Sequence, residues 1–76
     1  MAALRGKFGK RLRYLRRNHD LTQEEFAERV GVSVDFISNV ERGVNAPSFE
    51  TIEKFAFVLK ISVHELFLYN EDNSNE

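Results

Sequence analysis

Only two residues, Gly31 and Val32, separate one predicted helix from the cap of the next, and this spacing constrains the fold more than any other feature of the chain. The first helix of this pair has Thr22 as its N-cap, and Glu25 stands where it completes a capping box. The helix stops at Gly31, because glycine readily takes the left-handed conformation that ends a helix. Ser33 caps the second helix. The sequence therefore predicts two short, nearly contiguous helices joined by a tight turn.

Three further helices surround this pair. The first is a helix that begins near Leu4. It is predicted by apolar residues at helical spacing, Phe8, Leu12 and Leu15. Ser48, directly after Pro47, caps another helix. Its expected core stripe consists of Phe49, Ile52, Phe55, Ala56 and Leu59. Ser62 and Glu65 repeat the capping box ahead of a last helix that reaches about Tyr69. Because no segment alternates with a period of two, the predicted fold is all-α, with five helices.

A chain of 76 residues has room for one domain, which we place at residues 1–69. Residues 70–76 contain no apolar side chain and are net negative, so we expect a disordered acidic tail. The absence of cysteine excludes disulfides and thiolate metal sites. We expect no metal and no cofactor, and a core this small favours self-association.

Charge is distributed unevenly along the chain. Residues 1–17 contain seven of the eleven Lys and Arg and no acid, which leaves four cations against twelve acids, a net charge of −8, in residues 18–76. A basic end can face nucleic-acid phosphates, although a solvated helix face explains the same run of charge. The first residues meet charge before any apolar stretch long enough for a signal peptide or membrane span, so we expect a soluble, cytoplasmic protein with no membrane partner.

The motifs together resemble a known family. They are LTQEEFA at 21–27, GVS at 31–33, ISNVERG at 37–43 and PS at 47–48. Over residues 8–67 the chain is similar to the phage-repressor, or lambda-repressor-like, helix-turn-helix domains. The resemblance implies a compact five-helix DNA-binding domain whose third helix, about residues 33 to 42, enters the major groove while the second lies across the backbone. It further implies a sequence-specific transcriptional regulator with double-stranded DNA as its partner.

The resemblance also implies roles for single residues. Gln23 would bind a phosphate at the amino end of the second helix, where unpaired N–H groups already favour an anion; otherwise it is an ordinary exposed residue. Ser33 caps the third helix and is also a DNA-binding candidate. The loop 44–46 lacks the basic residues that many relatives use to hold phosphates, so Arg42 and Asn45 are the remaining candidates there. Asp20 stands where the family usually has glycine.

Four residues of the third helix correspond to base-facing positions. Asn39 could pair with N6 and N7 of adenine, Val34 could touch a thymine methyl group, and Ser38 could reach either kind of partner. Asp35 can accept a hydrogen bond from cytosine N4, but its carboxylate also stabilises the amino end of the helix without DNA. Both interpretations of Asp35 stay open.

Two structural features complete the expectation. In this family a buried ion pair, here Arg16 with Glu41, links the first helix to the third. An apolar cluster near the end of the chain suggests a homodimer that reads a near-palindromic operator. Its members are Phe57, Leu66, Phe67 and Tyr69.

Other classes of function fit less well. The chain has no glycine-rich phosphate loop, and its two histidines, His19 and His64, lie in different segments, so we do not expect an enzyme. A protein-binding module on the same fold, antitoxin-like or coactivator-like, remains the alternative. Within the regulators, the short chain resembles both stand-alone phage regulators and the controller proteins of restriction-modification systems, and no small-molecule effector is evident.

Overall fold

The computed structural model describes residues 3–69 and places five helices in them, with no strand in that range. They are α1 (Ala3–Asn18), α2 (Gln23–Val30), α3 (Val34–Glu41), α4 (Phe49–Leu59) and α5 (Val63–Leu66). The all-α, five-helix expectation is confirmed. The tail expected at residues 70–76 lies outside the described residues.

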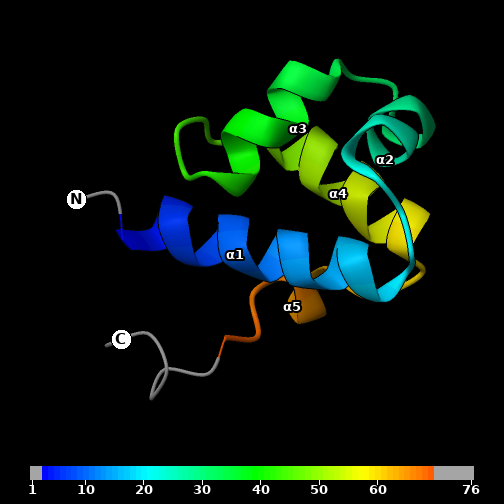
Figure 1. The fold of residues 1–76 in the computed structure, drawn as a ribbon. Helices are drawn as coiled ribbons and strands as arrows, with labels where there is room; N and C mark the ends of the chain where they lie inside the picture. Colours follow the sequence, from blue (N-terminus) through cyan, green and yellow to red (C-terminus); the bar gives the residue numbers. More distant parts are fainter. Residues whose placement is uncertain (1–2, 70–76) are drawn as a thin grey trace.

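Helix α1 runs across the middle of the molecule, with α2 and α3 on one side of it and α5 on the other (Figure 1). It packs against α3 and α5, while α4 packs against α2 and α5. The tight turn between α2 and α3 makes these two helices the most extensively packed pair. The α2–α3 pair therefore packs on α1 through α3 and on α4 through α2.

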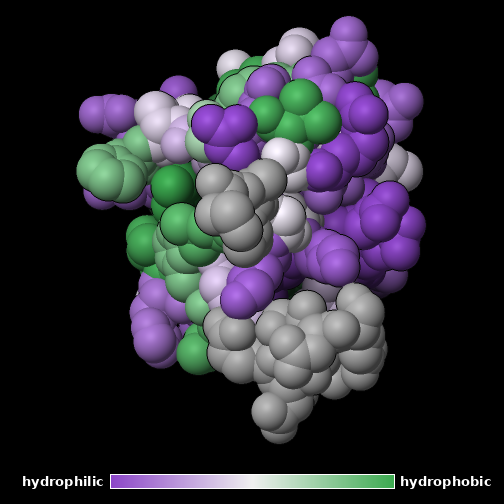
Figure 2. All heavy atoms as spheres, turned by 90° about the vertical axis from the view of Figure 1, so that its left-hand side faces the viewer, coloured by the Kyte–Doolittle hydropathy of each residue, from purple (hydrophilic) through white to green (hydrophobic). Residues whose placement is uncertain are grey.

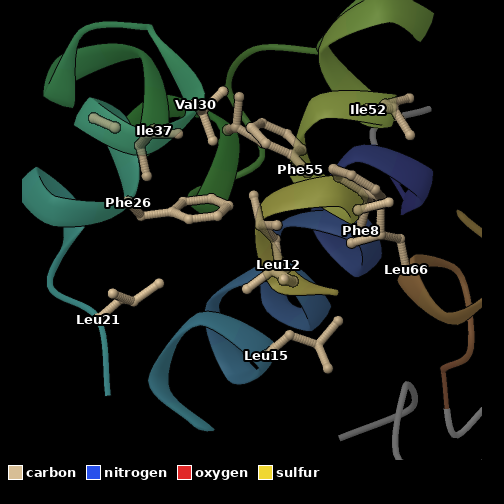
Figure 3. Close-up of a cluster of buried hydrophobic side chains, with 14 residues drawn as sticks. Phe8, Leu12, Leu15, Leu21, Phe26, Val30, Ile37, Ile52, Phe55 and Leu66 are labelled. Carbon is tan, nitrogen blue, oxygen red and sulfur yellow. The ribbon is translucent and has the colours of Figure 1, made fainter. Parts of the chain in front are cut away.

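The core takes side chains from all five helices and from Leu21 in the α1–α2 connection (Figure 3). Phe55 of α4 lies at its centre, with ring centroids 5.4 Å from Phe26 of α2 and 6.3 Å from Phe8 of α1. Aromatic pairs at such distances add roughly 0.5–1.5 kcal/mol beyond the area that they bury. Leu66 of α5 has no exposed surface and closes the core on the far side of α1.

The caps of the α2–α3 pair form as expected. Thr22 Oγ1 accepts from the Glu25 backbone N–H at 3.0 Å, and the Glu25 carboxylate accepts from the Thr22 N–H at 2.9 Å, so the capping box is complete. Gly31 is left-handed, with φ of 91°. Ser33 Oγ accepts from the Phe36 N–H at 3.0 Å. Local sequence signals thus set both ends of the turn.

The end of the chain departs from expectation. Helix α5 stops at Leu66 instead of reaching Tyr69, and the Ser62 side chain makes no capping hydrogen bond. The Glu65 N–H instead donates to the backbone oxygen of Ser62 at 3.1 Å, and the Phe67 N–H donates to the oxygen of His64 at 3.0 Å. These i to i+3 bonds tighten the segment into a single turn that ends early.

Phe49 was wrongly assigned to the core stripe of α4. It is 84% exposed, because it is the first residue of α4 and projects away from the core, and burial starts at Ile52. The stripe from Ile52 to Leu59 is buried as predicted.

Helices α1 and α3 meet at a glycine. A Cβ atom on Gly9 would lie 2.4 Å from the backbone oxygen of Val40 and 2.6 Å from that of Glu41. Only a residue without a side chain allows this approach. Within residues 3–69, two residues other than glycine are left-handed, Asp20 with φ of 56° and Lys60 with φ of 60°. Asp20 is the position where the resemblance leads us to expect glycine.

Candidate nucleic-acid interface

Helix α3 is anchored by its inner face and presents its outer face to solvent. Ile37 and Val40 are buried against the core. Of the expected base-facing residues, Asp35 is exposed, while Val34, Ser38 and Asn39 are half-buried. The side chain of Val34 packs partly against the core, so only part of it is available to a ligand.

The structure brings Arg16 and Glu41 together as a buried ion pair between α1 and α3. Arg16 Nε donates to Glu41 Oε2 at 2.6 Å, and Nη2 donates to Oε1 at 3.1 Å. The remaining amino group, Nη1, donates to the backbone oxygen of Leu21 at 2.6 Å. Arg16 is 6% exposed and Glu41 is 4% exposed. Both charges therefore have hydrogen-bond partners inside the protein.

Gln23 joins this pair. Its Nε2 donates to Glu41 Oε1 at 3.0 Å, which ties the first residue of α2 to the last residue of α3. The side chain is half-buried and held in place, which does not fit the interpretation of an ordinary exposed residue. One N–H of the amide and its oxygen stay available for a ligand at the amino end of α2.

The sequence did not single out Arg13, which lies beside the same carboxylate. Its Nε is 3.9 Å from Glu41 Oε1, and its side chain is 48% exposed. Arg13 precedes Arg16 by three residues and therefore shares its side of α1. That spacing is the signal that could have indicated it.

At the carboxyl end of α3 the structure brings Asn39, Arg42 and Asn45 together. Arg42 Nη2 donates to Asn39 Oδ1 at 2.5 Å. The backbone oxygen of Asn39 accepts from the N–H groups of Val44 at 2.8 Å and Asn45 at 3.2 Å. An amide, a cation and the α3–α4 loop thus form one hydrogen-bonded unit. Ser33 lies at the other end of α3 and is exposed.

The predicted dimer patch is divided by the fold. Leu66 is wholly buried, so its assignment to an interface is wrong, because the core uses its entire side chain. Phe67 is 37% exposed and lies against Phe8, with ring centroids 5.1 Å apart, and Tyr69 lies 6.4 Å from Phe67. Phe57 is 83% exposed on α4.

Within residues 3–69, no three His, Asp or Glu side chains gather in a way that could hold a metal ion. None of the helices described there has the length and apolar character needed to cross a membrane.

Comparison with known proteins shows which family shares this sequence and this arrangement of helices. Residues 12–66 match the helix-turn-helix family named HTH_3. YazB of Bacillus subtilis, an uncharacterised HTH-type transcriptional regulator, is 42% identical over 59 residues, which cover 78% of this chain and 86% of YazB. The cryptic phage CTXphi transcriptional repressor RstR of Vibrio cholerae is 36% identical over 69 residues, 91% of this chain and 62% of RstR. The crystal structure of the restriction-modification controller protein C.AhdI from Aeromonas hydrophila superposes with a TM-score of 0.81 at 41% identity, over 83% of this chain and 96% of that one.

The two capped helices, their two-residue turn and these relatives define a helix-turn-helix protein of the transcriptional-regulator class. The chain belongs to the HTH_3 helix-turn-helix family. It is a DNA-binding regulator and not an enzyme. The resemblance to phage repressors and controller proteins inferred from the motifs is confirmed.

Proposed function

We propose that the chain is a sequence-specific DNA-binding transcriptional regulator that inserts α3 into the major groove and rests the amino end of α2 on the phosphate backbone. The observation that carries this proposal is the hydrogen bond from Gln23 to Glu41. It fixes the start of α2 relative to the end of α3, so a phosphate contact at one would set the position of base contacts along the other.

The phosphate-binding site would consist of the N–H groups at the start of α2, the Gln23 amide and Arg13. The helix dipole favours an anion at this end. Arg13 supplies a half-exposed cation next to Gln23, since both side chains approach Glu41 Oε1. This cation offsets the absence of basic residues in the loop 44–46.

The reading surface would consist of the outward residues of α3. They are Val34, Asp35, Ser38 and Asn39, together with the N-cap Ser33. Arg42 and Asn45 follow at the carboxyl end of α3, where they would contact the phosphate backbone of the DNA. Phosphate contacts fix the position of the protein, and base-edge contacts confer the sequence preference.

We also propose that the protein binds as a homodimer through Phe57, Phe67 and Tyr69, near the ends of α4 and of the described chain. Phe57 projects an almost fully exposed ring from a domain with a small core. A two-fold pair would read a near-palindrome with half-sites one helical turn apart, roughly 34 Å.

The test separates the two kinds of contact by fluorescence anisotropy on cognate and scrambled duplexes. Gln23→Ala should weaken binding to both duplexes similarly. Asn39→Ala should weaken cognate binding by about 1 to 3 kcal/mol and leave binding to the scrambled duplex nearly unchanged. Equal losses on both duplexes for Asn39→Ala would remove that residue from the readout.

Arg42→Ala is the charged control. Loss of one phosphate-binding cation should flatten the log-log dependence of affinity on salt by about one unit, which the two neutral substitutions should not do. If all three variants give the same salt slope, Arg42 is not a phosphate contact.

One observation favours the second candidate, a protein-binding module. An open apolar groove of about 200 Å³ lies between the amino end of α1 and the α3–α4 loop. Apolar side chains gather on this face (Figure 2). The side chains that line it include Leu4, Phe8, Pro47, Phe49 and Phe67. A salt titration on random duplex DNA discriminates, because phosphate-driven affinity falls steeply with salt, and failure to bind duplex DNA even at low salt would favour the protein-binding role.

A further inference from the structure

The side-chain amide of Asn39 is held in one orientation by its neighbour Arg42. One guanidinium nitrogen of Arg42, Nη2, donates to the side-chain oxygen of Asn39. An arginine side chain has donors and no acceptor, so the amide atom that faces it is the oxygen. The nitrogen of the amide, with its two N–H groups, therefore forms the free end of the side chain.

The backbone of Asn39 is held as well. Its carbonyl oxygen accepts from the N–H groups of Val44 and Asn45, which lock the end of α3 to the following loop. A side chain fixed at both its backbone and its oxygen reaches a ligand with a defined end. In this arrangement that end can only donate.

An amide that turns its N–H groups toward the base does not match adenine. Pairing with adenine needs an acceptor for N6–H and a donor for N7, whereas guanine presents two acceptors, N7 and O6, in the major groove. The two N–H groups of Asn39 match both guanine atoms.

We propose that Asn39 reads guanine and that Arg42 determines this preference by holding the amide oxygen toward itself, which leaves the N–H groups facing the base. The proposal rests on the proposed function, since it assumes that α3 reads the major groove. Arg42 is thus a positioning residue that orients the Asn39 amide, in addition to its expected contact with the DNA phosphate backbone.

The first experiment locates the base pair. Selection of binding sites from random duplexes with the whole protein, followed by anisotropy with Asn39→Ala, identifies the position at which that variant loses discrimination. The wild-type protein is then titrated with four duplexes that differ only in this base pair. We expect guanine to be preferred over adenine by roughly 5- to 150-fold, the value of one bidentate contact of about 1 to 3 kcal/mol. A preference for adenine would overturn the proposal.

The second experiment tests Arg42. In Arg42→Ala the amide oxygen is released, so the guanine preference should fall at least fivefold in favour of adenine. The ratio of dissociation constants within one variant cancels any uniform loss from the missing charge. Arg17→Ala removes an exposed cation from α1 and is the matched control, which should keep the wild-type ratio. An unchanged ratio in Arg42→Ala would overturn the proposal.

A third variant, Asn39→Asp, keeps the shape but cannot donate. It should lose the guanine preference, whereas a residue that pairs with adenine would keep its contact to N6–H. If the selection enriches no sequence at all, the proposed function fails, and the guanine preference falls with it. Enrichment of a site with adenine opposite Asn39 would instead leave the proposed function intact and reject the guanine preference alone.

Discussion

At the scale of single residues, the carboxylate of Glu41 accepts hydrogen bonds from α1 through Arg16 and from α2 through Gln23. Glu41→Ala should lower the free energy of unfolding by about 3 to 5 kcal/mol, because the Arg16 charge then stays buried without its counter-ion. Urea denaturation measures this loss. Glu53→Ala, on the exposed side of α4, is the matched control and should change stability by less than about 0.5 kcal/mol. A shift for Glu41→Ala as small as that of the control would mean that the ion pair contributes little.

The sequence predicted only part of the cluster around Glu41, and did so through the family resemblance. The pairing of Arg16 with Glu41 was expected only through the resemblance to a family, since the two residues are 25 apart in sequence and belong to different helices. The bond from Gln23 to Glu41 and the approach of Arg13 were not predicted. Both depend on how closely α1, α2 and α3 dock, and no local pattern records that distance.

At the scale of helices, the sequence predicted the caps of α2 and α3 correctly but not the cap of α5, where the Ser62 side chain makes no hydrogen bond. Thr22 and Ser33 cap as expected, because a cap involves only residues within one turn. The end of α5 was placed too late, and Phe49 was placed in the core. Both errors arise where the amphipathic pattern runs past the point at which tertiary packing stops, so periodicity alone could not detect them.

A pair of glycines in α1 tests the docking of helices. Gly9→Ala should destabilise the fold by roughly 1 to 3 kcal/mol, because the new methyl group would collide with the backbone oxygens of Val40 and Glu41, which cannot move without displacing α3. Gly6→Ala is the matched control. Apart from the backbone of its own helix turn, nothing lies within 4 Å of the added methyl group, so better helix propensity should raise stability by up to about 1 kcal/mol. Thermal unfolding of both variants measures the contrast, and shifts of the same sign would contradict it.

At the scale of the whole molecule, the proposed dimer can be tested with two exposed phenylalanines of α4. Phe57 is 83% exposed and Phe49 is 84% exposed, so neither substitution to glutamate should disturb the core. If the dimer forms through the end of α4, Phe57→Glu should shift the equilibrium to monomer and Phe49→Glu should leave it unchanged. Analytical ultracentrifugation distinguishes the two. The opposite result would move the interface to the groove beside the α3–α4 loop.

The shared carboxylate of Glu41 also has a consequence for how the protein opens. Because one buried side chain joins three helices, the turn between α2 and α3 cannot separate from α1 without stranding a charge in the core. Local opening of α3 should therefore cost nearly as much free energy as global unfolding. In native-state hydrogen exchange, the slowest amides of α1 and α3 should exchange with the same protection and in a single step, as one cooperative unit.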